Sequence, residues 1–304
     1  MNRKVLLCLA AMSMATLTVG ANSNANYQSA AGSIITSEFS NMASQQNNWL
    51  SRTTLSIGFQ KHWKPMYTVE TVQPLTKYDA TSDHVVFAQG RLSNQSDIGT
   101  TANVGIGYRY ITNNDTTMYG ANTFFDYGFK EKHERMGFGL EYLHNESELR
   151  ANIYKGLSGA REVDTTNHIF EKVVDGYDVE YASTFKNAAY AKAYINAYHW
   201  DFKHTDDSNG IRMGAQVQLT PRVSVDVGYN KASHVKGEAY GQVMYRLTDT
   251  KVALWNGKHS NEQESTVRSK MLDKVRRNNN IIVERYGNKN TVKSTKIHYS
   301  IRVL

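Results

Sequence analysis

Polar and apolar residues alternate along this chain from about residue 51 to about residue 248. The clearest runs are Ala102–Tyr110, Met136–Tyr142 and Val223–Tyr229, in which every second residue is apolar or aromatic. A repeat of two places the apolar side chains on one face of a β-strand and the polar side chains on the other. No helical period interrupts the series. The pattern predicts an antiparallel transmembrane β-barrel with an apolar exterior and a polar lumen.

About twelve strands account for the alternating region, each close to the roughly 9–11 residues that a tilted membrane strand needs. Their predicted ranges are 51–60, 66–76, 84–93, 99–111, 116–127, 134–145, 147–158, 174–184, 188–202, 210–220, 222–231 and 237–248. An even number of strands places both barrel ends in the periplasm, with short turns there and longer loops outside. The assignment obeys this rule, because the links at Glu146 and Pro221 fall on the periplasmic side and the longest loop, Gly159–Val173, falls outside.

The N-terminal segment has the features of an export signal. Arg3 and Lys4 precede the apolar run Val5–Leu17, and small residues follow it. The run is too short to span a bilayer. We therefore expect a signal peptide over residues 1–25 and a periplasmic segment over 26–50, with a short amphipathic helix within Ala31–Asn48. The single cysteine, Cys8, would leave with the signal, so we expect no disulfide and no cysteine metal site.

Composition favours a barrel over a bundle of membrane helices. The 304-residue chain has a mean hydropathy of −0.54, and its 19 Tyr, 10 Phe and 4 Trp suit the two membrane interfaces. A soluble β-sandwich is the alternative, but its strand faces would have to meet in a dry core. The net charge of +7 comes largely from the C-terminal end. Such a tail could neutralise acidic lumen residues or lipopolysaccharide phosphates, or it could simply be solvated; it does not indicate nucleic-acid binding.

Charged residues between the outward apolar positions mark the predicted lumen. Both signs occur, so these residues could pair across the lumen or hold a segment threaded through it, whereas unpaired charges would favour a water-filled interior. The candidates for lumen and linker contacts are Arg109, Arg135, Glu141, Arg150, Asp178, Glu180, Asp226 and Arg246. The inward face also carries Gly105, Gly107, Gly137 and Gly139, which leave room inside the barrel.

The spacing of apolar residues along the chain changes beyond the last strand, in residues 249–304. Val267, Met271, Leu272 and Val275 have helical spacing and predict a periplasmic helix over Ser265–Arg277. Residues 279–304 regain extended character, and about 26 extended residues reach roughly 85 Å, enough to cross a hydrocarbon core of about 30 Å. We therefore expect a linker in the pore; the alternative is that residues 291–304 pair as an extra strand, or as a hairpin that turns at Gly287–Asn290.

Three segments resemble the β-domain of the intimin/invasin family, the inverse autotransporters. They are residues 103–110 (NVGIGYRY), 119–127 with 133–141 (YGANTFFDY, HERMGFGLE) and 272–286 (LDKVRRNNNIIVERY). The resemblance implies a twelve-stranded outer-membrane barrel, a periplasmic helix, and a linker that leads through the pore to displayed adhesive domains. Because the chain ends at Leu304, we expect no passenger domain and carry over only the anchor and translocator roles. We also expect no peptidoglycan-binding module before the barrel.

No arrangement of residues predicts catalysis. Ser, His and Asp are present without a linking motif, and His199, Asp201 and His204 fit no strong metal-ligand spacing. We read the stripe of Tyr190, Tyr194, Tyr198 and Trp200 as lumen packing or an interface rather than a sugar-stacking surface. We therefore expect no enzyme activity, no cofactor and no metal.

The favoured interpretation is a bacterial outer-membrane anchor and translocator whose lumen is plugged by its own linker. A small channel or porin is one alternative, and a surface-binding protein acting through loop Gly159–Val173 is another. The expected partners are outer-membrane lipid and lipopolysaccharide, with the barrel-assembly machinery and periplasmic chaperones during biogenesis. No nucleic acid is expected, and any surface or host ligand stays unassigned.

Overall fold

The computed structural model describes residues 49–60, 64–79, 81–95, 98–112, 115–249, 254 and 267–287. The chain divides into two compact units, Met1–Ser51 and Arg52–Leu304. Of the first unit, only the start of the 3-10 helix η1 (Trp49–Arg52) is described. The predicted signal peptide and the predicted helix before residue 49 therefore lie outside the described residues.

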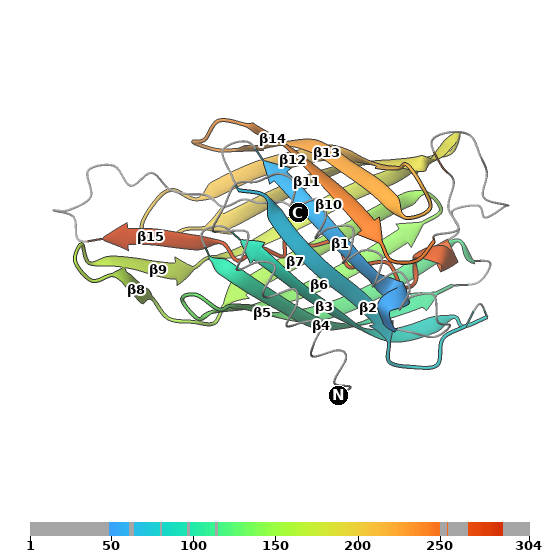
Figure 1. The fold of residues 1–304 in the computed structure, drawn as a ribbon, viewed down its shortest axis with the longest axis horizontal. Helices are drawn as coiled ribbons and strands as arrows, with labels where there is room; N and C mark the ends of the chain where they lie inside the picture. Colours follow the sequence, from blue (N-terminus) through green and yellow to red (C-terminus); the bar gives the residue numbers. More distant parts are fainter. Residues whose placement is uncertain are drawn as a thin grey trace, which may run out of the picture. The chain divides into compact units, whose positions relative to one another are not determined.

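Twelve strands of the second unit close into one antiparallel barrel, in which the first strand pairs with the last (Figure 1). The barrel strands are β1 (Thr53–Gln60), β2 (Met66–Pro74), β3 (His84–Gln95), β4 (Gly99–Ile111), β5 (Thr117–Gly128), β6 (His133–His144), β7 (Ser147–Gly156), β10 (Asp175–Phe185), β11 (Ala188–Asp201), β12 (Ser208–Gln218), β13 (Val223–Ala232) and β14 (Glu238–Arg246). Each bound lies within two residues of the predicted one, and the predicted fold class is confirmed. Closure leaves neither edge strand unpaired, which lipid requires because it offers no water to the backbone.

The alternation of side chains follows the predicted pattern. In β4, Val104 and Tyr108 face outward with 61% and 46% exposure, while Asn103 and Arg109 face inward and are buried. The other strands repeat this division: large apolar side chains cover the outside, and the inside holds polar and charged side chains together with an apolar group that includes Phe87 and Leu143. Among the described residues, no helix is both long enough and apolar enough to cross a membrane.

The links between strands differ at the two ends of the barrel. At the end that we call the turn end, only Asn145 and Glu146 join β6 to β7, and only Lys186 and Asn187 join β10 to β11. At the opposite end, the loop end, residues 157–174 join β7 to β10. This segment, predicted as the longest loop, contains a hairpin of its own, β8 (Arg161–Asp164) and β9 (Ile169–Val173).

Residues 267–287, called the linker from here on, run from one end of the barrel to the other. They begin at the turn end with the 3-10 helix η3 (Val267–Lys270) and finish at the loop end with β15 (Val283–Gly287) (Figure 1). β15 pairs with β9, which gives a three-stranded sheet in the order β15-β9-β8. The extended course of the linker thus agrees with the prediction of a segment inside the pore.

The helix predicted over Ser265–Arg277 is wrong within the described residues. η3 is a single short turn, and the chain beyond Met271 is not helical. The cause lies in the wall: the carbonyl of Met271 accepts a hydrogen bond from Arg109, and the N–H of Val275 donates to Gln89. Wall side chains thus satisfy backbone groups that a helix would pair internally.

Inward-facing glycines leave space for aromatic rings. A Cβ atom at Gly107 would lie 2.3 Å from the Phe87 ring, and one at Gly105 would lie 2.5 Å from the Phe124 ring. Both rings are buried, at 0% and 2% exposure. Glycine is therefore needed at these positions so that the rings can pack directly against the backbone.

We expect Gly107→Ala to lower the free energy of unfolding by about 1–3 kcal/mol, because the added methyl group overlaps a buried ring. Gly90→Ala is the matched control: Gly90 lies in the neighbouring strand β3, and a methyl group added there would lie 3.9 Å from its nearest neighbour, a methyl carbon of Thr71. Urea unfolding of the folded barrel in detergent would compare the two variants. Equal midpoints would contradict the packing argument.

Candidate functional site

The linker closes the turn end of the lumen with apolar contacts. Val267, Met271 and Val275 are each at most 2% exposed. They share one buried cluster with wall residues Val72, Val85, Phe87, Ile111, Met118, Phe124 and Leu143. Full burial of such a side chain contributes about 1.5–3 kcal/mol, so these three residues alone favour a seated linker over a solvated one.

Arg268, next to Val267 of this apolar cluster, binds two of the links between strands at the turn end. Its guanidinium donates to Asp115 at 2.6 and 2.8 Å, to Asp83 at 2.9 Å and to the Ser82 carbonyl at 2.5 Å. The hydrogen bonds from Arg268 lower the pKa of Asp115, and those to Asp115 and Asp83 raise the pKa of Arg268. The contribution of the Asp115 pair is therefore present above the ordinary Asp pKa and is lost as the pH falls through the lowered value.

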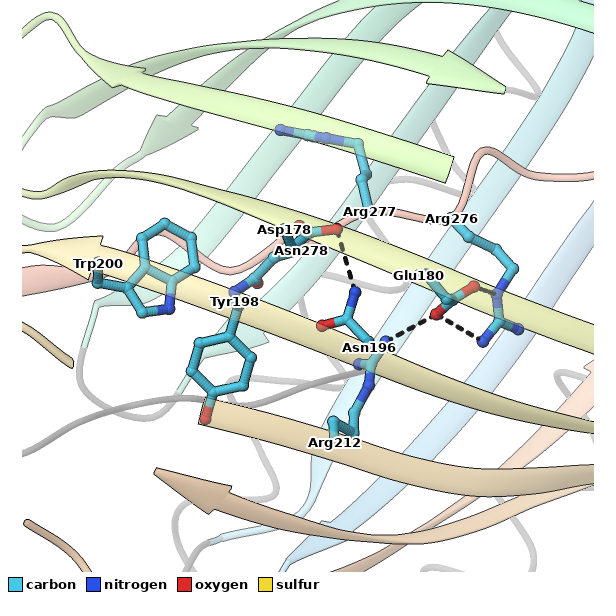
Figure 2. A pocket seen from close by; sticks show the side chains of 9 residues that line it. All are labelled: Asp178, Glu180, Asn196, Tyr198, Trp200, Arg212, Arg276, Arg277 and Asn278. Atoms are coloured by element: carbon cyan, nitrogen blue, oxygen red, sulfur yellow. Dashed lines mark hydrogen bonds and ion pairs between the residues drawn. The ribbon is translucent and has the colours of Figure 1, made fainter. Parts of the chain in front are cut away.

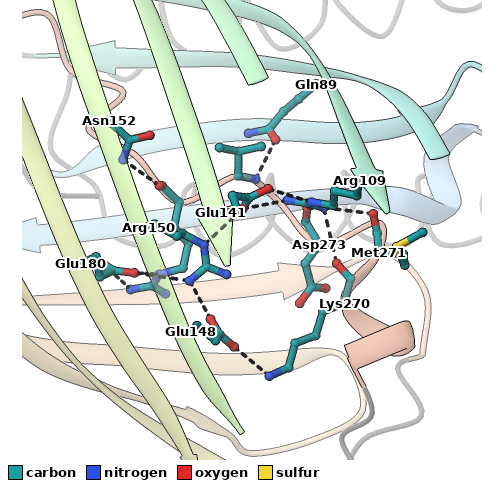
Figure 3. A network of polar contacts seen from close by, with 12 residues as sticks. Gln89, Arg109, Glu141, Glu148, Arg150, Asn152, Glu180, Lys270, Met271 and Asp273 are labelled. Carbon is teal, nitrogen blue, oxygen red and sulfur yellow. Dashed lines mark hydrogen bonds and ion pairs between the residues drawn. The ribbon is translucent and has the colours of Figure 1, made fainter. Parts of the chain in front are cut away.

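Arg109 of β4 holds the linker by its backbone (Figure 3). Its Nη1 donates to the carbonyls of Met271 at 3.0 Å and Asp273 at 2.6 Å, while its Nε donates to Glu141 at 2.8 Å. Glu141 also accepts from Arg150 at 3.2 Å. Because Arg109 binds carbonyl groups, this grip does not depend on the side chains of the linker residues that it holds.

A second set of charges continues this network toward the start of β7 (Figure 3). Glu148 accepts a hydrogen bond from Arg150 at 2.7 Å and pairs with Lys270 of the linker at 2.9 Å. Lys192 of β11 adds a further contact to Glu148 at 3.3 Å. Glu148 is 1% exposed, and its cluster with three cations is the arrangement that a buried carboxylate needs.

Arg276 and Arg277 are adjacent in sequence and bind different parts of the wall. Arg276 donates to Glu180 of β10 at 2.5 and 3.1 Å (Figure 2). Its guanidinium lies 4.6 Å from the Tyr194 ring centre. Arg277 donates to both oxygens of Asp126 in β5 at 2.8 and 2.7 Å. Charge-assisted, bidentate contacts of this kind fix both the position and the orientation of the arginine side chain.

Asp126 is the centre of a buried triad. Its carboxylate lies between Arg277 and Arg135 of β6, which donates at 2.8 Å, and all three side chains are at most 1% exposed. Arg135 also donates to the carbonyls of Asn278 at 2.7 Å and Asn280 at 2.9 Å. One wall arginine and one wall aspartate thus hold both the side chain and the backbone of the linker.

The asparagines of the linker contribute mainly backbone groups. Asn103 donates to the Asn279 carbonyl at 2.9 Å, and the N–H of Asn278 donates to the Tyr154 hydroxyl at 2.7 Å. A cavity of about 10 Å³, enough for one water molecule, remains beside this segment. Its lining residues are Asp178, Glu180, Asn196, Tyr198, Trp200, Arg212, Arg276, Arg277 and Asn278 (Figure 2).

Seven of the eight predicted lumen residues are buried within the barrel. They are Arg109, Arg135, Glu141, Arg150, Asp178, Glu180 and Asp226. Arg109, Arg135 and Glu180 hydrogen-bond the linker directly. The other four bind wall side chains: Asp178, for example, accepts from Tyr154 at 2.6 Å, and Asp226 accepts from Tyr194 at 2.6 Å.

The prediction that the eighth residue, Arg246, lies in the lumen is wrong. Arg246 ends β14 at the turn end and is exposed, and within the described part of the chain its side chain makes no linker contact. The strand stops there, so a side chain at an inward position of the alternation lies exposed at the rim of the barrel instead of in the lumen.

Sequence reasoning missed several wall residues that contact the linker. They are Gln89, Asn103, Asp126, Glu148, Asn152 and Tyr154. Strand parity could have found Asp126, which lies two residues from the inward Phe124. The neighbouring Phe125 obscured that signal, because two adjacent aromatic residues hide which face is apolar.

The residues weighed for metal binding are engaged in other contacts. His199 bonds Asn209 at 2.9 Å, Asp201 accepts from Lys203 at 2.5 Å and His204 bonds Glu284 at 2.9 Å. Within the ranges that the structure describes, no group of three His, Cys, Asp or Glu side chains is placed to hold a metal ion.

Three residues of the predicted aromatic stripe, Tyr194, Tyr198 and Trp200, pack inside the lumen, whereas Tyr190 is only partly buried. Tyr194 and Tyr198 are buried, and their side chains occupy the space beside Gly214 and Gly210 of β12. Trp200 is fully buried against Tyr154, with ring centres 5.4 Å apart.

A closed antiparallel cylinder with an apolar exterior and a charged, filled interior defines an outer-membrane β-barrel. Sequence comparison gives the family: the pattern of the inverse autotransporter β-domain matches residues 10–279, and the chain belongs to that family. Its location is accordingly the bacterial outer membrane.

Two relatives come from Escherichia coli (strain K12). A "Putative attaching and effacing protein homolog" is 33% identical over 112 residues, which cover 37% of this chain and 36% of the relative. "Uncharacterized protein YchO" is 34% identical over 85 residues, 28% of this chain and 18% of the relative. The chain thus matches about a third or less of the length of these relatives.

Among solved structures, the chain described under "Unveiling the Mechanism Behind the in-meso Crystallization of Membrane Proteins" has a TM-score of 0.65. It is 20% identical, and the match covers 77% of this chain and 99% of that one. At this identity the likeness establishes the fold alone, and it agrees with the observed barrel.

Proposed function

We propose that the barrel exports its C-terminal segment through the pore, anchors that segment in the outer membrane and stays closed around it. The turn end then faces the periplasm and the loop end faces the outside. The course of the linker carries this proposal, because residues 267–287 begin beside the turns at Asp83 and Asp115 and finish paired with the hairpin at the loop end.

The wall is suited to hold an extended segment. Arg109 and Arg135 donate to linker carbonyls, and Gln89 and Tyr154 accept from linker N–H groups. An extended chain has no internal hydrogen bonds, so these side chains replace the water that it would otherwise need. The apolar cluster around Met271 then excludes water from the turn end.

The proposal has two further parts. The name of the first E. coli relative supports a role in attachment, in which the barrel would serve as the anchor for an adhesive segment. The exposed apolar band would contact outer-membrane lipid and lipopolysaccharide. Periplasmic chaperones and the barrel-assembly machinery would insert the chain.

Two measurements on the full chain test the proposal. An epitope tag after Leu304 should bind antibody on intact cells, and the purified protein in planar bilayers should conduct far less than an open barrel. A tag that is accessible only after the outer membrane is permeabilised would contradict export. Steady, high conductance would contradict closure and would favour the alternative of a small channel.

A further inference from the structure

The linker makes its last described contacts outside the lumen, at the loop end. β15 pairs antiparallel with β9 from Val283 opposite Val173 to Gly287 opposite Ile169. The hairpin that supplies β9 lies between two barrel strands, β7 and β10, so it is fixed to the wall at both of its ends. The partner of β15 is therefore a preformed strand edge on the barrel itself.

Glu284 occupies a site made of backbone donors in the loop between β11 and β12. Its carboxylate accepts from the N–H groups of Lys203 at 3.2 Å, His204 at 2.6 Å and Thr205 at 3.1 Å. The His204 ring adds a bond at 2.9 Å. Glu284 is 2% exposed, and three successive N–H groups form a concave site that suits an anion.

The next residue, Arg285, binds on the other face of the sheet. Its Nε donates to Glu171 of β9 at 2.5 Å, and Glu171 also bonds Nε2 of His133 at 2.8 Å. Glu171 is 1% exposed, so Arg285 and His133 supply the partners that its buried carboxylate requires.

Tyr286 completes the set with aromatic contacts. Its ring stacks on His204 at 3.6 Å between ring centres and on Phe170 at 5.8 Å. Glu284 and Tyr286 thus share one face, and Arg285 lies on the opposite one. A slip of one residue would turn Arg285 toward the three N–H donors and Glu284 toward Glu171, so both contacts would become repulsive.

We propose that the β8–β9 hairpin and residues 202–207 form a peptide-binding site that captures the exported strand Val283–Gly287 by β-strand addition. The ligand class is an extended segment that carries an acidic, a basic and an aromatic residue in succession. Capture in one register holds the exported segment against return to the periplasm. This inference rests on the proposed export function and adds a site that acts after the segment has crossed the pore.

Engineered disulfides on the full chain test the capture. In a Cys8→Ser background, Ile169→Cys with Gly287→Cys places two thiols directly opposite each other, at a Cα separation of about 4.5–5.5 Å that a disulfide accepts. Phe170→Cys with Gly287→Cys is the out-of-register control. We expect only the first pair to cross-link on intact cells, as mapped by mass spectrometry of non-reduced peptides.

A third substitution tests recognition. Glu284→Arg should slow the cross-linking of the 169–287 pair by at least about tenfold, because a cation then faces three N–H donors. Glu162→Arg is the control: Glu162 lies in β8 and bonds His168, away from β15. Equal rates for these two variants would overturn the recognition of Glu284.

The tag after Leu304 separates the two proposals. Absence of the 169–287 cross-link with the tag exposed would overturn capture and leave export standing. A tag held in the periplasm would overturn export, and with it the capture of an exported strand. Cross-linking with the tag exposed, slowed by Glu284→Arg alone, is the result that supports both.

Discussion

The double variant Arg276→Met/Arg277→Met is expected to turn a closed barrel into one that opens frequently in planar bilayers. Each arginine makes charge-assisted hydrogen bonds to a buried wall carboxylate, Glu180 or Asp126. Loss of such bonds costs about 1.5–3 kcal/mol for each arginine, so the open fraction should rise by roughly 10²–10⁴-fold. Single-channel recording measures this fraction directly.

The barrel itself should survive this change. After both substitutions, Asp126 still pairs with Arg135 at 2.8 Å, and Glu180 still pairs with Arg212 at 3.2 Å. Methionine also keeps an apolar stem where the two arginines pass aromatic rings. The effect therefore falls on the seating of the linker and not on the wall.

Lys274→Met provides the matched control for the double variant. Lys274 lies in the same linker, but its side chain is 37% exposed, and its nearest carboxylate, that of Glu70, is 3.7 Å away. Its removal should change the opening frequency little, because exposed or distant ion pairs contribute about 0–1 kcal/mol. If the double variant opened no more often than Lys274→Met, the plug would not depend on its arginines.

The second large effect is expected from Asp126→Asn, which should destabilise the folded protein by about 3–5 kcal/mol. The substitution leaves the guanidinium groups of Arg135 and Arg277 buried beside each other without their carboxylate. Removing one partner of a buried ion cluster costs this much because the remaining charge has no solvent to stabilise it. Urea unfolding of the full chain measures the change.

Asp226→Asn is the control for that measurement. Asp226 is also a buried lumen aspartate, but its hydrogen bond comes from the Tyr194 hydroxyl. Adding Arg277→Met to Asp126→Asn should recover part of the lost stability, since one of the two unpaired cations is removed. Equal unfolding midpoints for Asp126→Asn and Asp226→Asn would refute the central role of the triad.

The barrel could be predicted from the sequence because the pattern that specifies it, the alternation of apolar and polar residues, lies within each strand. A period of two determines which side chains face lipid. From this alternation alone, the twelve strands and seven of the eight lumen residues could be predicted. The exception, Arg246, lies where parity continues but the strand ends. The alternative of an extra strand over 291–304 lies outside the described residues, whose last strand is β15.

The linker was harder to predict, because its conformation depends on contacts with distant strands. The spacing of Val267, Met271 and Val275 fits a helix, yet these residues fill an apolar cluster of the wall while Arg109 and Gln89 take the backbone groups. The contacts of β15 at the loop end were equally hard to predict from the sequence. No local period reports that Glu284 meets three N–H groups about 80 residues earlier in the chain.

The pairing of charges within the wall bears on the order of assembly. Four lumen carboxylates each keep a cation from the strands: Asp126 keeps Arg135, Glu141 keeps Arg109, Glu148 keeps Lys192 and Glu180 keeps Arg212. A barrel that closes before residues 267–287 enter it would therefore leave none of these four carboxylates without a cation. Closure of the barrel and insertion of the linker can then occur one after the other, with a hydrated barrel that lacks the linker as the intermediate.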